Sequence, residues 1–150
     1  MKKTFLLSIF FITLGTILGI FLRNSYKDNL LGAFGEGKIY YFLQEGVYSN
    51  KDIMTENTKD LNIKLVNEEN GKYYVYLGIT RDEENVKKIK EIYNTKGYQL
   101  YIKEVNLSNE EFYNNVTQFD LLIKNTTKEE EILTIEEVVL ANYEEIIKKQ

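Results

Sequence analysis

Hydrophobic and polar positions alternate along two segments of the chain that resemble each other. The first is Tyr41–Tyr48 and the second is Tyr74–Gly78. Each is an aromatic, alternating run of the kind that forms β-strands, and each reaches a glycine followed by a short polar turn. A charged stretch with helical spacing comes next in both cases. The pattern therefore predicts two strand–glycine–helix units, in which the glycines permit backbone angles or close approaches that a side chain would block.

A further strand follows each of the two helices, so the predicted order is β-α-β-β-α-β. The expected strands cover residues 39–47, 62–67, 72–79 and 98–105, and the expected helices cover residues 50–60 and 82–95. Asn70-Gly71 is a strong turn dipeptide and joins the second and third strands as a hairpin. This order predicts an α+β, ferredoxin/RNP-like antiparallel sheet with the helices on one face and the other face open.

Alternation along each strand assigns side chains to the two faces. Leu43, Val75 and Leu77 are expected to point toward the helices. In the fourth strand the pattern alone does not decide, and we assign Gln99, Tyr101 and Lys103 to the open face. The candidate binding residues on that face are Tyr40, Phe42, Gln44, Lys72, Tyr74, Tyr76 and Tyr101. Tyrosine rings can stack on sugars, although these residues are also ordinary strand formers that the C-terminal helices could cover.

Two more helices are predicted after the sheet. Residues 108–111 and 127–130 both match a capping box, and apolar residues recur at helical spacing after each one. A short turn at Asn125-Thr126 makes an antiparallel hairpin of the two helices. Its apolar stripe needs a partner surface, which could be the domain itself, a second copy or another protein.

The N-terminal segment predicts a membrane anchor. Lys2 and Lys3 precede an uncharged run from Thr4 to Leu22. Such a run spans about 28 Å as a helix, close to the thickness of the bilayer core. A secretory signal peptide is the alternative, but its apolar core is shorter and ends in small residues. We expect the N-terminus in the cytoplasm and the domain outside.

The resulting expected organisation has four parts. These are a transmembrane anchor with a cytoplasmic N-tail (1–23), a flexible tether (24–37), the sheet domain (38–106) and the helical hairpin (107–150).

Composition excludes several classes of function. Histidine and cysteine are absent from the 150 residues, which removes the usual zinc and haem ligands, thiol nucleophiles and Ser-His-Asp triads. The net charge of −4 argues against a nucleic-acid binder. Most acidic residues lie beside lysines, as on solvated helices. We therefore expect no catalysis, no metal and no cofactor.

The two strand–glycine segments resemble the SPOR domain, a family of bacterial peptidoglycan-binding modules. The resemblance lies in Phe42–Tyr48 and Tyr74–Gly78, and it covers about residues 38–104. It implies an envelope protein whose open sheet face binds peptide-stripped glycan strands, often at the division or sporulation septum. The family's first-strand glutamine falls on Gln44, whereas Thr80 replaces the aromatic residue usual after the second glycine. The alternative is a membrane-tethered adaptor whose C-terminal helices (108–150) bind a partner protein.

Overall fold

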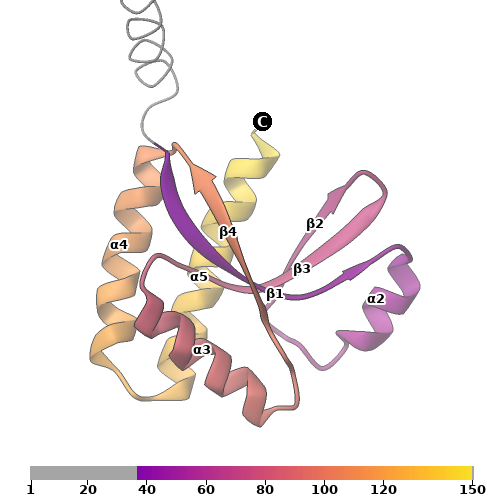
Figure 1. Ribbon diagram of the computed structural model, residues 1–150, viewed down its shortest axis with the longest axis horizontal. Helices are drawn as coiled ribbons and strands as arrows, with labels where there is room; N and C mark the ends of the chain where they lie inside the picture. The colour runs from indigo at the N-terminus through magenta and orange to yellow at the C-terminus, as the bar shows by residue number, and fades with distance from the viewer. Residues whose placement is uncertain (1–36, 150) are drawn as a thin grey trace, which may run out of the picture. The chain divides into compact units, whose positions relative to one another are not determined.

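The computed structural model describes residues 37–149. The expected membrane segment, residues 4–22, lies outside the described residues. Between residues 37 and 149 no helix is both long and apolar enough to cross a bilayer. The elements are β1 (Lys38–Tyr48), α2 (Lys51–Asn57), β2 (Leu65–Glu69), β3 (Lys72–Thr80), α3 (Glu83–Thr95), β4 (Tyr101–Leu107), α4 (Glu110–Asn125) and α5 (Glu129–Lys148), as Figure 1 shows.

The four strands form one antiparallel sheet in the order β2-β3-β1-β4. This arrangement confirms the predicted β-α-β-β-α-β succession and the antiparallel sheet. The long strand β1 lies in the interior of the sheet, where it pairs with both β3 and β4. Strands β2 and β4 form the two edges.

Local sequence signals account for most element boundaries. The side chains of Asn50 and Asp82 accept hydrogen bonds from backbone N–H groups in the first turns of α2 and α3. Asn70 and Gly71 both have positive φ, at 53° and 72°, as a two-residue hairpin of this type requires. Gly97, with φ of 88°, ends α3.

Other predicted boundaries were wrong. Strands β2 and β4 begin about three residues later than expected, at Leu65 and Tyr101. Neither predicted capping box forms: Asn109 rather than Ser108 caps α4, and α5 begins after Lys128 with no side-chain cap. Ile53 is 57% exposed because α2 is short and turns only Met54 toward the sheet.

One hydrophobic core lies between the sheet and helices α2 and α3. Leu43 from β1 and Val75 and Leu77 from β3 contribute to it, as predicted, together with Ile89 and Tyr93 from α3. These side chains are at most a few per cent exposed. The removal of this apolar surface from water is what fixes α3 on the sheet.

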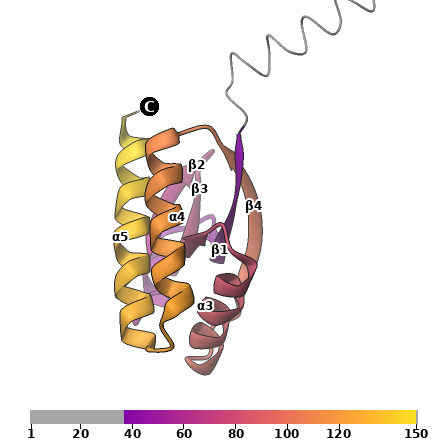
Figure 2. The ribbon, with the colours of Figure 1, turned by 90° about the vertical axis from the view of Figure 1, so that its left-hand side faces the viewer.

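A second core lies on the opposite face of the sheet, and α4 and α5 cover it. Figure 2 shows the two helices side by side along the strands. Tyr40 and Phe42 from β1 and Tyr76 from β3 pack there against Phe112 of α4 and Val139 of α5. The expectation of helices on one face and an open second face is therefore wrong. The apolar stripe of the hairpin covers the aromatic face, which was one of its alternative partners.

Polar contacts also fix the hairpin to the sheet domain. Asp120 of α4 accepts hydrogen bonds from the Thr80 hydroxyl, from the Arg81 N–H at 2.9 Å and from Asn85 Nδ2 at 3.2 Å. Lys88 of α3 donates to three carbonyl groups at the end of α4. Lys38–Gln150 accordingly forms one compact unit.

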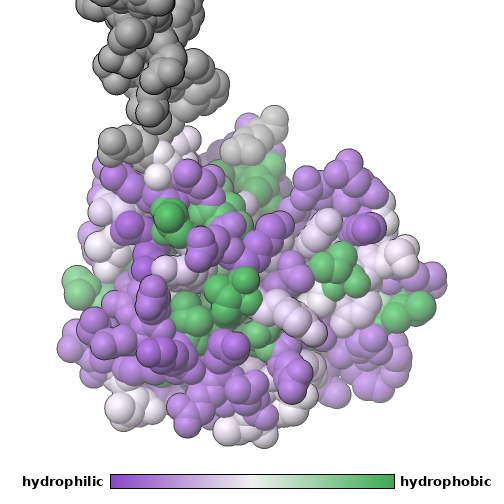
Figure 3. Space-filling model, in the orientation of Figure 1, coloured by the Kyte–Doolittle hydropathy of each residue, from purple (hydrophilic) through white to green (hydrophobic). Residues whose placement is uncertain are grey.

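The molecular surface on the side of α3 and β4 is mostly hydrophilic. Figure 3 shows hydrophobic residues there as small separate groups. Scattered groups of this size are normal on a protein surface and do not indicate a docking site.

Candidate functional site

Three of the seven candidate binding residues lie under the hairpin and are inaccessible. The exposed fractions of Tyr40, Phe42 and Tyr76 are 0%, 1% and 4%. The Tyr40 ring stacks on Phe112 with centroids 5.3 Å apart, and Phe42 meets Tyr143 of α5 edge-on at 4.9 Å. These rings stabilise the hairpin on the sheet and have no free face for a ligand.

The other four candidates lie on the same face of the sheet but beyond the hairpin. Gln44 pairs with Tyr101 across β1 and β4, and their side chains therefore share this face. Tyr101 is 66% exposed, Lys72 is exposed, and Gln44 and Tyr74 are half-buried. We call this uncovered part the residual face. It consists of Gln44, Val47, Asn67, Glu69, Lys72, Tyr74, Tyr101 and Lys103.

Antiparallel pairing makes the residual face continuous. The hairpin covers the first half of β1 and the second half of β3. Because neighbouring strands run in opposite directions, the second half of β1 lies next to the first halves of β3 and β4. The side chains left uncovered on these strands therefore meet at one end of the sheet.

β1 is irregular at this end of the sheet. The register with β3 shifts between Leu43 and Gln44 and again between Gln44 and Gly46. A Cβ at Gly46 would lie 2.9 Å from the Tyr48 ring, so glycine leaves room for the ring to fold back over the strand. The Tyr48 hydroxyl then donates to the Glu45 carboxylate at 2.8 Å. A close approach, one of the two alternatives predicted for this glycine, is observed.

The electrostatics of the residual face are set by few groups. Lys103 Nζ lies 5.2 Å from the centroid of the Tyr74 ring, a cation–π contact. Glu69 faces Lys72 across β2 and β3. Burial, followed by the neighbouring Tyr74 and Glu69, raises the pKa of Tyr76, so its hydroxyl stays neutral. The face thus combines an exposed tyrosine and half-buried aromatic and amide groups with two ammonium groups and one carboxylate, which suits non-covalent binding of a polar ring compound.

Some positions of the residual face, and two buried acids, were not among the candidate residues. Lys103 was placed on this face but not in the site, and Val47 and Asn67 were not expected there. Strand alternation could have identified Asn67 if the start of β2 had been known. The buried acids Asp120 and Glu136 were also missed, although Glu136 sits within the apolar stripe of α5, at four residues from Ile132.

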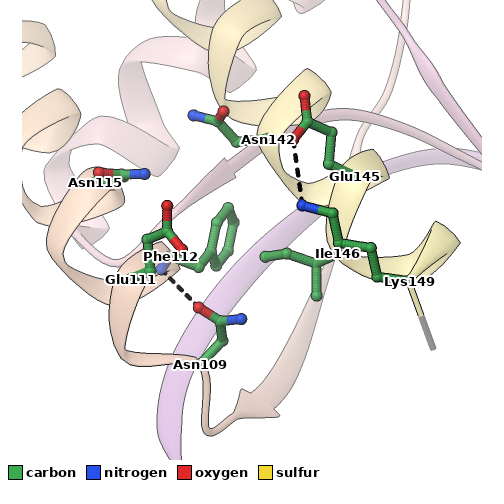
Figure 4. Close-up of a pocket in the computed structure, with 8 residues that line it drawn as sticks. All are labelled: Asn109, Glu111, Phe112, Asn115, Asn142, Glu145, Ile146 and Lys149. Atoms are coloured by element: carbon green, nitrogen blue, oxygen red, sulfur yellow. Dashed lines mark hydrogen bonds and ion pairs between the residues drawn. The ribbon is translucent and has the colours of Figure 1, made fainter.

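A separate pocket lies between the start of α4 and the end of α5 (Figure 4). Its polar groups are partly engaged with one another. Asn109 Oδ1 accepts from the Phe112 N–H at 2.8 Å, and Lys149 pairs with Glu145 at 3.8 Å. Phe112 is buried, so the pocket has no free aromatic surface.

Among residues 37–149, acidic side chains form no group of three or more that could hold a metal ion.

Comparisons with known proteins find a similarity to a solved domain structure. No family model matches the chain, and no curated protein matches it. Among solved structures, the chain is similar to the solution structure of the peptidoglycan binding domain of the B. subtilis cell wall lytic enzyme CwlC. The two are 18% identical with a TM-score of 0.38, and the match covers 45% of this chain and 91% of that domain. That domain is a SPOR domain, the family that the strand–glycine motifs resemble.

Proposed function

We propose that this protein binds peptidoglycan glycan strands stripped of their stem peptides, through the residual face and without chemistry of its own. The observation that carries the proposal is the shared, accessible position of Gln44, Tyr74 and Tyr101 at one end of the sheet. Tyrosine rings stack on the apolar faces of sugars, and the Gln44 amide can bond to hydroxyl or N-acetyl groups. Gln44 is also the position that the SPOR resemblance marks.

The proposal places the domain in the cell envelope. The expected membrane segment at residues 4–22 would hold it on the outer side of the cell membrane, close to the wall and at a division or sporulation septum. Binding there needs no enzyme activity, metal or cofactor. The buried residues Tyr40, Phe42 and Tyr76 have a structural role in this proposal.

Sedimentation with insoluble peptidoglycan tests this function. The full-length chain, in mild detergent, is mixed with peptidoglycan before and after an amidase has removed the stem peptides. We expect more protein in the pellet after amidase treatment. Absence of binding to both materials, by protein shown to be folded by circular dichroism, would refute the proposal.

Substitutions on the residual face test whether it is the binding surface. Gln44→Ala with Tyr101→Ala removes the amide and the most exposed ring without touching either core, and should abolish most of the binding. Gln118→Ala with Ile53→Ala is the matched control, because both residues are exposed on helices away from the residual face. Tyr76→Ala is unsuitable because it would open a cavity in the core.

A further inference from the structure

The residual face carries more positive than negative side chains. Its charged residues are Glu69, Lys72 and Lys103. Lys72 has Glu69 directly opposite on β2. Lys103 is on the edge strand β4, and the residue opposite it on β1 is the uncharged Phe42. Lys103 joins no ion pair within residues 37–149. An unpaired ammonium group therefore stands at the aromatic surface.

The position of this ammonium group suits an anionic ligand. Lys103 Nζ lies over the Tyr74 ring at 5.2 Å, while Tyr101, two residues earlier on the same strand, presents its ring to solvent. A ring compound stacked on Tyr101 would bring its substituents next to Lys103. Because β4 is an edge strand, such a ligand could approach without displacing another element.

We infer that the residual face recognises the free carboxylate of a sugar acid, with Lys103 as the group that pairs with it. This inference rests on the proposed function and specifies the ligand. In intact peptidoglycan, the lactyl carboxyl group of muramic acid is held in an amide bond to the stem peptide. Hydrolysis of that amide breaks the C–N bond, adds water and releases the peptide amine as an ammonium group. It leaves a carboxylate on the glycan, which is ionised at neutral pH.

The inference gives a physical reason for a preference for stripped glycan. Loss of the peptide does more than remove bulk, because each hydrolysed amide becomes a negative charge on the sugar. A lysine close to a stacking surface would bind the carboxylate by a charge-assisted hydrogen bond, and it would bind the carbonyl of the uncharged amide more weakly. An amide-hydrolysing enzyme must therefore act on the wall before this protein binds.

The test separates charge from bulk by using three probes with the full-length chain. They are amidase-treated peptidoglycan, the same material after carbodiimide coupling of its carboxylates to methylamine, and chitin as a neutral N-acetylated polymer. We expect binding to the first probe to be roughly tenfold tighter than to the second, as expected for one charge-assisted contact. Chitin should bind as weakly as the neutralised glycan.

Substitutions at Lys103 provide the second arm. Lys103→Gln should lower affinity for the carboxylate form to the level of the neutralised form, whereas Lys103→Arg should retain the difference. Lys87→Gln, at an exposed position of α3, is the matched control and should change neither. Equal binding of the charged and neutralised glycans by the wild-type chain would overturn the inference and leave the proposed function standing. Failure to bind any of the three probes would overturn both.

Discussion

A carboxyl oxygen of Glu136 on α5 accepts a hydrogen bond from the backbone N–H of Ile79 on β3, at 2.8 Å. The pairing of β2 with β3 ends at Leu65 opposite Tyr76, so this part of β3 has no strand beyond it. A helix side chain satisfies the free N–H at the sheet edge instead. Glu136 is fully buried, and its second oxygen has no hydrogen-bond partner within the described part of the chain.

The contact between Glu136 and β3 predicts that Gly78→Ala destabilises the fold. A Cβ at residue 78 would lie 3.0 Å from Glu136 Oε2 and 3.4 Å from Ile89 Cγ2. Both neighbours are buried and cannot move freely, so overpacking should lower the free energy of unfolding by about 1–3 kcal/mol. Urea denaturation followed by circular dichroism measures the change, and an unaltered midpoint would contradict the prediction.

A double-mutant cycle identifies the cause. Glu136→Ala removes the atoms that the new methyl group would meet first. Gly78→Ala should therefore be less destabilising in the Glu136→Ala background than in the wild type. An equal effect in both backgrounds would mean that Ile89 or the backbone, and not the carboxylate, opposes the substitution.

Burial of Glu136 predicts that stability falls as the pH rises. Burial raises the pKa of Glu136 from 4.5 to about 8, the hydrogen bond from Ile79 lowers it in part, and the charge of Asp120 raises it. Between these two pKa values the folded protein keeps a proton that the unfolded chain has lost. The free energy of unfolding should therefore decline through this window and level off above the folded-state pKa.

Asp120 adds to this trend with the same sign. Burial raises its pKa as well, although three hydrogen-bond donors oppose the shift. Urea unfolding at intervals from about pH 5 to pH 9 measures the decline. Glu136→Gln cannot lose a proton and should give a flatter profile. Identical slopes for this variant and the wild type would show that another group is responsible.

Because the helical hairpin covers the second core, we expect the sheet domain not to fold stably without it. Truncation of residues 108–150 would expose Tyr40, Phe42, Tyr76 and Ile79, all buried under the hairpin. The remaining sheet should aggregate or lose cooperative unfolding, because one of its faces would be apolar and uncovered. Thermal melting and NMR chemical-shift dispersion report this loss.

A shorter truncation is the control for this experiment. Removal of Lys148–Gln150 deletes the end of α5 beyond its buried residues and should leave the melting transition in place. If the chain without residues 108–150 instead melts cooperatively at the wild-type temperature, the hairpin is a separate module. That result would return support to the adaptor alternative.

Local signals in the sequence were sufficient to predict much of the fold. The helix caps at Asn50 and Asp82 and the Asn70-Gly71 turn involve residues within three positions of each other, so each can be recognised without knowledge of the rest of the chain. Alternation in β1 and β3 correctly separated Leu43 and Val75 from the residues of the opposite face. These signals together determined the order of elements and the antiparallel sheet.

The sequence predicted only part of the candidate site. Strand alternation placed Tyr40, Phe42 and Gln44 on one face. Tyr101 was assigned to that face although the pattern of the fourth strand left the choice open, and the pairing confirms all four positions. An aromatic sheet face has the same sequence pattern whether a ligand or a helix covers it. Alternation therefore could not distinguish the buried Tyr40 and Phe42 from the accessible Tyr101.

The sequence by itself thus determined the order of the strands and helices and, for β1 and β3, which side chains share a face, because neighbouring residues decide these properties. Only the tertiary structure decided which part of the face stays open. The docking of α4 and α5 depends on contacts such as Phe42 with Tyr143 and Ile79 with Glu136, between residues far apart in the chain. Those contacts bury one half of the aromatic face as core and leave Gln44, Tyr74 and Tyr101 accessible at the other.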